Sequence, residues 1–302
     1  MFLYLAHYAP HLPLQAPVKY VERCMERYRA GYDVLRKQRF EKQKSLELIP
    51  EGMKLPVFHK EFGGRRPSWE ELAPEQQERW IKDMATYAAM IEIMDEGIGL
   101  VIEELRKKGM YENTVFLFMS DNGATDEGGF IGQLMSDLSN TPYRNYKKWV
   151  FQGGTSSPLI LCHGNKGKNP QRGKVCNQPA HIIDIMPTCM ALGNVAYPKT
   201  FSHADLPGTN LLPAITDQSI HKRTLYFEHQ SSCAIIEGNW KLVRADRNSQ
   251  WELIDLDKDP FESHDLSATY PDKVEELESK WIEWANTHKV FPLEAKTWQE
   301  RI

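Results

Sequence analysis

Residues 114–123 read TVFLFMSDNG, and this stretch decides the class of fold. A run of β-branched, aromatic and aliphatic residues ends abruptly in Ser120-Asp121-Asn122-Gly123. Such a run, followed by a polar turn, is typical of a buried strand in a parallel sheet. Since ligand sites in open α/β sheets form beyond the carboxyl ends of the strands, the polar turn is a candidate site.

The segments around this stretch predict further strands and helices in alternation. SPLILCHG (157–164) predicts a second strand of the same kind, and FLYLA (2–6) predicts a short buried one. Helices are expected where apolar residues recur every three or four positions, at 18–46, from Pro74 to Gly109 and at 181–193. The alternation favours an α/β fold with a mostly parallel sheet.

The start of the long helix carries two local signals. Ser68 and Glu71 have the spacing of a capping box, and Pro74 suits the first turn. Gly109 stands where a C-terminal cap belongs.

The last third of the chain has a different pattern. Short strands separated by turns predict an antiparallel sheet, and an amphipathic helix is expected to follow it at 271–288. The predicted strands are 224–229, 233–238, 239–245 and 251–256. We therefore predict one domain over residues 1–199 and a C-terminal α+β subdomain over 200–302.

Composition excludes several functional classes. The 302 residues contain 37 Lys and Arg against 41 Asp and Glu, a net charge of −4. This balance argues against a nucleic-acid partner, since nucleic-acid affinity depends on a cationic face. No apolar run approaches the roughly 20 residues of a membrane helix, and the first residues lack the basic leader of a signal peptide.

Asp121 and Asn122 are candidate metal ligands. A carboxylate and an amide oxygen side by side suit a hard cation such as Ca²⁺ or Mg²⁺. The alternative is an ordinary turn, because Asp-Asn-Gly is a common turn sequence.

His11 and Lys147 are candidate anion contacts. Lys147 precedes a glycine pair, Gly153-Gly154, that permits close approach of the backbone, and its ammonium is a point positive charge. His11 is held in the sequence APHLP (9–13). The alternatives are a surface lysine and a loop histidine bonded to the backbone.

Taken in order, these segments resemble the sulfatase family of the alkaline-phosphatase-like superfamily, over essentially the whole chain. The segments that carry the resemblance are FLYLAHYAPHLPLQAP (2–17), YRAGYDVLRKQR (28–39), MSDNG (119–123), TPYRNYKKWVFQGGTSSPLI (141–160), DIMPT (184–188), GNWKLV (238–243) and WELIDLDKDPFESHDL (251–266). The resemblance implies a partial alkaline-phosphatase-like sandwich with a mostly parallel sheet, plus the C-terminal subdomain.

The resemblance also implies roles for individual residues. Asp121 and Asn122 would be two ligands of a divalent cation, usually Ca²⁺ in this family. Lys147 would contact the sulfate oxygens, and His11 would contact sulfate and stand near the leaving oxygen as a proton donor. The pair Glu228-His229 resembles an E-H pair that often precedes G-N in bacterial members, but Gln230-Ser231-Ser232 follows it here. For His229 the alternatives are therefore a substrate contact and a packed histidine.

One part of the family pattern is missing. Family members use a formylglycine nucleophile made from Cys or Ser in a (C/S)-x-(P/A)-x-R motif, and none of the five cysteines, nor any serine, lies in such a motif. The paired N-terminal aspartates that complete the metal site are also missing. We therefore expect this chain to be the C-terminal part of a sulfatase, inactive alone, whose partners include the N-terminal half.

The expected function is a sulfuric ester hydrolase acting on sulfate esters, including sulfated glycans. A non-catalytic module that binds sulfated ligands or a partner is one alternative, and a superfamily phosphodiesterase or phosphonate hydrolase is another. By resemblance, the protein would be periplasmic, secreted or lysosomal.

Overall fold

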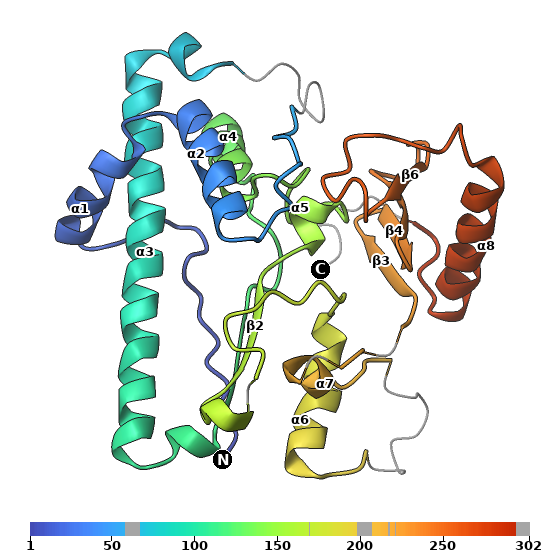
Figure 1. Cartoon of the computed structure of the whole chain (residues 1–302). Helices are drawn as coiled ribbons and strands as arrows, with labels where there is room; N and C mark the ends of the chain where they lie inside the picture. The colour runs from blue at the N-terminus through green and yellow to red at the C-terminus, as the bar shows by residue number, and fades with distance from the viewer. Residues whose placement is uncertain (58–66, 169, 198–206, 217, 221, 294–302) are drawn as a thin grey trace. The chain divides into compact units, whose positions relative to one another are not determined.

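The structure, a computed structural model, describes residues 1–57, 67–168, 170–197, 207–216, 218–220 and 222–293 (Figure 1). The chain divides into two compact units. The first contains Met1–Glu104, Asn122–Ser156 and Leu225–Ile302, and the second contains Leu105–Asp121 and Ser157–Thr224. The predicted boundary at residues 199 and 200 falls within 198–206, outside the described residues.

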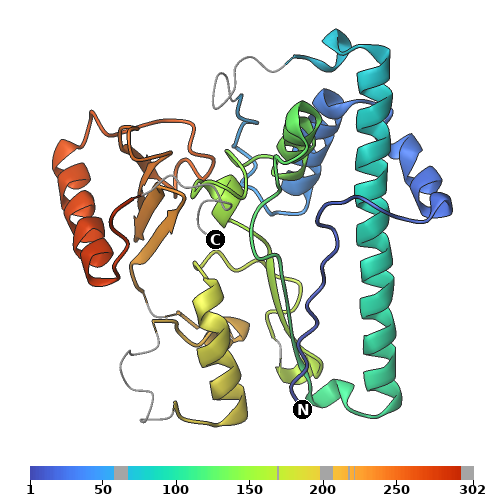
Figure 2. The same ribbon diagram turned by 180° about the vertical axis from the view of Figure 1, so that it is seen from behind.

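The helical part of the first unit is built on one long helix. Its helices are α1 (Val18–Tyr28), α2 (Tyr32–Ser45), α3 (Pro74–Lys107) and α4 (Gly129–Ser139). Trp80 and Met84 of α3 pack with Tyr32 of α2 and Leu134 of α4 in one apolar cluster. Figure 2 shows α2 and α4 on one side of the N-terminal half of α3 and α1 on its other side. The predicted apolar stripe of α3 is thus core at this end of the helix.

The helix predicted over 18–46 is interrupted at Gly31. This residue has φ +78°, in the left-handed region, and a Cβ there would lie 2.4 Å from Cγ of Trp69. A side chain is therefore excluded both by conformation and by space. The prediction of one continuous helix over 18–46 was wrong, because the apolar residues on both sides of Gly31 keep helical spacing and do not reveal the break.

The predicted start of α3 is confirmed. The backbone N–H of Ser68 donates to Glu71 Oε2 at 2.7 Å, which completes a capping box around a short 3₁₀ turn, Trp69–Glu71. Helix α3 then begins at Pro74. Gly109 follows its end with φ +67°.

The C-terminal part of the first unit is an antiparallel sheet covered by a helix. The strands β3 (Leu225–His229), β4 (Ser232–Glu237), β5 (Trp240–Arg244) and β6 (Glu252–Asp255) pair in sequence order. Leu277 and Trp281 of α8 (Pro271–Thr287) are buried against one sheet face (Figure 1). The opposite face packs on Val150 and Phe151. The antiparallel sheet and its helix are as predicted.

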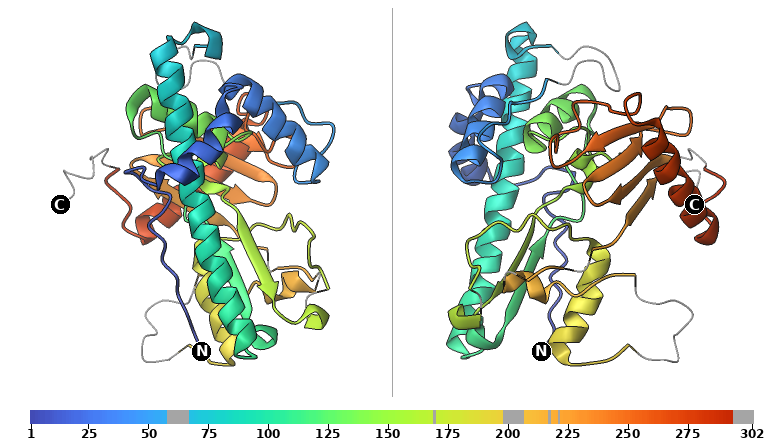
Figure 3. Two further views of the ribbon diagram at one scale, coloured as in Figure 1. Left: turned by 90° about the vertical axis from the view of Figure 1, so that its left-hand side faces the viewer. Right: turned by 45° about the vertical axis from the view of Figure 1, so that its right-hand side comes forward.

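The second unit contains a two-stranded sheet. Strands β1 (Val115–Met119) and β2 (Leu159–His163) run side by side (Figure 3) and pair antiparallel from Val115↔His163 to Met119↔Leu159. The unit also holds α6 (Ile185–Gly193) and α7 (Leu212–Ile215).

This pairing corrects one prediction. Both strands exist, but they are antiparallel to each other, and the opposed side chains of Phe118 and Ile160 are 41% and 57% exposed. An apolar run predicts a strand, but it does not encode the direction of the neighbouring strand. The described residues therefore form an α/β structure with antiparallel sheets.

Residues 2–6 do not form the predicted strand. No strand is assigned to them, and Phe2 and Tyr4 are 78% and 79% exposed. A strand needs a neighbouring strand to receive its backbone hydrogen bonds, and within the described residues none pairs with this segment. An apolar sequence alone does not supply that partner.

Across the ranges given above, no helix has both the length and the apolar character needed to cross a bilayer. All five cysteines are free thiols, and burial raises the pKa of Cys233 to about 11.

The DIMPT segment organises the second unit. Asp184 is fully buried and accepts hydrogen bonds from the backbone N–H groups of Thr209 at 2.8 Å and His181 at 2.7 Å. Both guanidinium nitrogens of Arg223 also donate to it. Thr188 Oγ1 accepts from the N–H of Leu211 at 2.9 Å. This motif therefore has a structural role.

Asp184→Asn is expected to lower the free energy of unfolding by about 3 kcal/mol, because it leaves the Arg223 charge poorly compensated. Burial alone would raise the pKa of Asp184, but Arg223 and the two amides outweigh it and hold the pKa below its usual range. Since the folded-state pKa is lowered, the carboxylate contributes stability above about pH 4 and loses it as the pH falls. Urea unfolding at pH 7 and pH 3 should show the difference between wild type and variant shrinking at low pH. A constant difference would contradict this account.

Candidate functional site

The loop after β1 meets the glycine pair backbone to backbone. The N–H of Gly123 donates to the carbonyl of Gly154 at 3.0 Å. A Cβ on Gly123 would lie 1.7 Å from the carbonyl oxygen of Gly153. Gly153 and Gly154 lie in the short helix α5 (Gln152–Thr155). The glycines therefore let the loop that begins at Asn122 approach α5 more closely than any side chain would allow.

Asn140, at the end of α4, joins three backbone segments. Its Oδ1 accepts from the N–H of Ala124 at 2.9 Å, and its Nδ2 donates to the carbonyls of Asn145 at 2.8 Å and Gly153 at 2.9 Å. Both amide protons are thus used. Asn140 fixes the loop after Asn122, the segment before Lys147 and the glycine pair against one another.

Lys147 and His11 come together from distant parts of the sequence. The N–H of Lys147 donates to the carbonyl of Ala124 at 2.9 Å, which ties Lys147 to the loop after Asn122. Its Nζ lies 3.4 Å from His11 Nε2. Glu127 completes the group, with Oε1 3.4 Å from Lys147 Nζ and Oε2 3.9 Å from His11 Nε2.

The contacts of His11 fix the orientation of its ring. Nδ1 lies 2.9 Å from the carbonyl of Leu12, which can only accept, so Nδ1 carries a proton in that bond. In the neutral ring, Nε2 then has the lone pair and faces the Lys147 ammonium. In the protonated ring, Nε2 is a donor available to an anion. Tyr8 donates to the same Leu12 carbonyl at 2.7 Å and supports the loop.

The other predicted site residues are His229, Asn122 and Asp121. His229, at the end of β3, donates from Nδ1 to the carbonyl of Lys148 at 2.8 Å, next to Lys147. Asn122 is half-buried, and its Nδ2 donates to the carbonyl of Gly123 at 2.9 Å. Asp121 is exposed and directly precedes Asn122 at the start of the same loop.

The donor atoms of Asp121 and Asn122 fit a hard cation in kind, since both offer oxygen. In number they fall short, because Ca²⁺ takes six to eight oxygen ligands. Among the residues whose positions are described, no group of three or more His, Cys, Asp or Glu side chains is arranged to hold a metal ion. The two residues are therefore a partial ligand set.

A buried charge network supports the glycine pair from the C-terminal sheet. Lys241 of β5 and Glu262 are both fully buried, with Nζ and Oε1 2.7 Å apart. Glu262 Oε2 accepts from the N–H of Gln152 at 2.7 Å. Arg144 binds Glu252 through both guanidinium arms, at 2.7 and 3.0 Å. The segment from Arg144 to the glycine pair is thus anchored at both ends.

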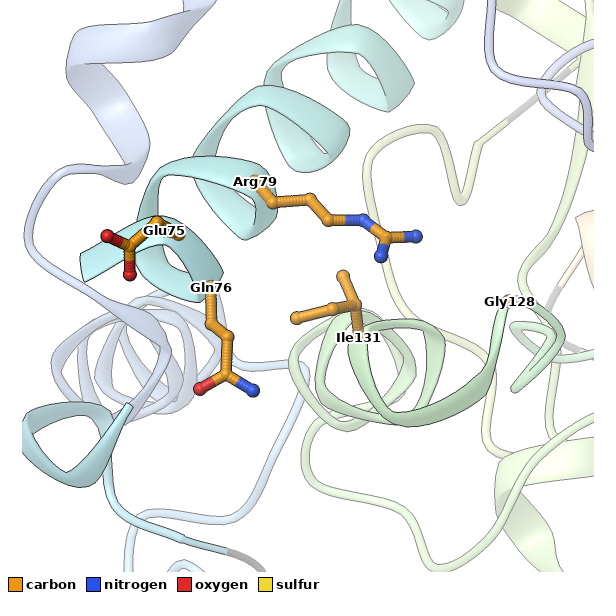
Figure 4. A pocket seen from close by; sticks show the side chains of 5 residues that line it. All are labelled: Glu75, Gln76, Arg79, Gly128 and Ile131. Carbon is orange, nitrogen blue, oxygen red and sulfur yellow. The ribbon is translucent and has the colours of Figure 1, made fainter. Parts of the chain in front are cut away.

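One hollow lies apart from these residues. It has a volume of about 360 Å³ and is lined by Glu75, Gln76, Arg79, Gly128 and Ile131 (Figure 4). These residues come from the start of α3 and the start of α4, and none is a predicted site residue. We place the candidate site at Lys147 and His11, where charged groups converge, and not at this hollow.

Sequence reasoning missed Glu127 and Asn140. Asn140 immediately precedes the segment 141–160, which carries part of the family resemblance. This adjacency was the only sequence signal for Asn140. Glu127 had no signal, because an acidic residue in a polar loop is ordinarily a solvated surface residue.

Comparison with known proteins identifies the family. The family model described as Sulfatase matches residues 1–195. An uncharacterised sulfatase of Schizosaccharomyces pombe is 32% identical over 320 residues, covering 93% of this chain and 57% of the relative. An arylsulfatase of Klebsiella aerogenes is 32% identical over 216 residues, covering 62% of this chain and 45% of the relative.

Solved structures share the fold. The crystal structure of Ps i-CgsB matches with a TM-score of 0.64 at 24% identity, over 98% of this chain and 52% of that one. A protein solved in complex with its substrate D-glucosamine-2-N,6-O-disulfate matches at 0.50 and 20% identity, over 75% and 45%. The phosphonate monoester hydrolase of Agrobacterium radiobacter also matches at 0.50 and 20% identity, over 70% and 43%.

The chain belongs to the sulfatase family, whose members are sulfuric ester hydrolases. It spans about half the length of the curated relatives that it matches.

Proposed function

We propose that this chain supplies the sulfate-binding side of a sulfatase active site, with Lys147 and His11 as its anion contacts. The observation that carries the proposal is the 3.4 Å approach of Lys147 Nζ to His11 Nε2. These residues lie 136 positions apart, and hydrogen bonds of Ala124, Asn140 and the glycine pair fix the segment that carries Lys147. Two adjacent groups able to donate hydrogen bonds suit a sulfate ester.

Each residue has a role in the proposed reaction. Lys147 binds the sulfate oxygens and offsets the negative charge that develops during transfer. His11, protonated at Nε2, donates to the ester and delivers a proton to the departing oxygen. A divalent cation, of which Ca²⁺ is the proposed ion, would neutralise charge on the sulfate when held by Asp121, Asn122 and further ligands. His229 is proposed as an outer substrate contact beside Lys148.

The nucleophile is proposed to come from outside this sequence. None of its cysteines or serines lies in a (C/S)-x-(P/A)-x-R motif, so we propose that the chain alone binds sulfate esters without hydrolysing them. The proposed partner is a segment that bears the formylglycine and the remaining metal ligands. The proposed sheet of the combined fold is mostly parallel, as in the sandwich that the family resemblance implies.

The proposed substrates are sulfate esters, including those of glycans. A related N-acetylgalactosamine-6-sulfatase from dog and the neighbour bound to D-glucosamine-2-N,6-O-disulfate support this class. The likeness to a phosphonate monoester hydrolase favours a second candidate, hydrolysis of phosphonate or phosphate esters that carry one negative charge.

Lys147→Met is expected to weaken binding of 4-nitrophenyl sulfate to the full chain at least tenfold, because it removes the one cation that faces His11 and Glu127 within the described residues. Calorimetric titration would measure the loss. Lys148→Met is the matched control, since Lys148 is exposed and its ammonium lies over the Trp149 ring. Equal effects of the two variants would contradict the assignment.

Incubation with 4-nitrophenyl sulfate also tests the proposal that this chain contains no nucleophile. We expect no release of 4-nitrophenol by the wild-type chain alone. Turnover that Lys147→Met abolishes would show that a nucleophile within this sequence had been overlooked.

A further inference from the structure

Glu127 places a carboxylate at the proposed anion pocket. It pairs with Lys147 at 3.4 Å and with His11 at 3.9 Å, and its side chain is 52% exposed. Within this cluster the lysine and the glutamate cancel, so only protonation of His11 adds a net positive charge. A pocket built to hold as much anionic charge as possible would not include this carboxylate.

We propose that Glu127 is a specificity residue that makes the pocket favour anions with one negative charge over anions with two. The proposal rests on the proposed function and deepens it. A sulfate ester carries one negative charge, whereas inorganic sulfate carries two. Hydrolysis converts the first into the second: R–O–SO₃⁻ and water give R–OH, SO₄²⁻ and a proton. Glu127 thus favours substrate over product.

The expected size of this effect follows from Coulomb's law. Two unit charges about 4 Å apart in water interact by an energy equivalent to roughly fivefold in a binding constant. A dianion beside Glu127 meets that repulsion twice. Removing the carboxylate charge should therefore strengthen binding of a monoanion about fivefold and that of a dianion about twenty-five-fold.

The carboxylate is not needed to hold the loop. Ion pairs as exposed as this one contribute little to stability. The loop is fixed instead by hydrogen bonds of its backbone N–H groups, among them the bond from the N–H of Glu127 to the Thr125 side-chain Oγ1 at 3.2 Å. A neutral residue at position 127 should therefore leave the fold intact while changing the charge of the pocket.

The test compares methyl sulfate with inorganic sulfate on the full chain at pH 6, where the first is a monoanion and the second a dianion, and at constant ionic strength. Binding is followed through the ring nitrogen resonances of His11 in chain carrying ¹⁵N-labelled histidine. Glu127→Gln should shift the ratio of the two affinities about fivefold towards inorganic sulfate. Glu127→Ala, a second neutral variant, should shift it in the same direction. Asp126→Asn, which removes the same charge one residue away, is the matched control and should leave the ratio near that of wild type.

Each remaining outcome decides the question. Binding of both anions with an unchanged ratio in Glu127→Gln and Glu127→Ala overturns this inference alone. An equal shift in Asp126→Asn also overturns it, because the effect would then be one of overall charge. Binding of neither anion by wild type or by either neutral variant overturns the proposed function together with this inference.

Discussion

Lys241→Met is expected to lower the free energy of unfolding by about 3–5 kcal/mol, because it leaves the Glu262 carboxylate buried without its cation. Burial raises the pKa of Glu262 and lowers that of Lys241, so each depends on the other to stay charged. Urea unfolding of the purified chain would measure the loss. The cost should be smaller at pH 5 than at pH 8, since a carboxyl with a raised pKa regains its proton as the pH falls.

The control for this prediction is the double variant Lys241→Met, Glu262→Gln. The glutamine keeps an acceptor for the Gln152 N–H and carries no charge, so most of the lost stability should return. A double variant no more stable than Lys241→Met would show that packing of the lysine stem, and not its charge, holds the sheet to α5.

Gly123→Ala is expected to abolish sulfate-ester binding and to cost about 3 kcal/mol of stability or more. The added methyl would lie 1.7 Å from the Gly153 carbonyl oxygen, which belongs to the backbone and has no rotamer by which to move aside. The Asn122 loop and the glycine pair must then separate, and the segment that carries Lys147 moves with them. Calorimetry and urea unfolding on the same preparation would measure both losses.

Gly99→Ala is the matched control. Gly99 lies inside α3, and a Cβ there has nothing within 4 Å. Alanine at that helical position should raise stability by up to about 1 kcal/mol and leave anion binding unchanged. Tolerance of Gly123→Ala to the same degree would contradict the close approach described for the loop.

Local signals in the sequence predicted local structure well. The Ser68–Glu71 capping box, the start of α3 at Pro74, the strands β3 to β6 and helix α8 each depend on neighbouring residues or on a simple repeat, and all are confirmed. Short turns between consecutive strands also fix their antiparallel order.

Features that depend on distant partners were not predictable in this way. The direction of β2 relative to β1 and the failure of residues 2–6 to form a strand are set by which strand lies alongside. The Lys241–Glu262 pair joins two buried charged residues that no local sequence pattern connects. Glu127 becomes notable only once Lys147 and His11 lie beside it. The family motifs singled out Lys147 and His11 without showing how Asn140 and the glycines position them.

The most direct test of the account is a crystal structure of the full chain grown with a sulfate monoester. We predict the sulfate group within hydrogen-bond distance of both Lys147 Nζ and His11 Nε2, with the Glu127 carboxylate remaining beside the bound anion. A sulfate bound elsewhere, with Lys147 and His11 still paired only to Glu127 and to each other, would contradict the central claim that these two residues form the anion site.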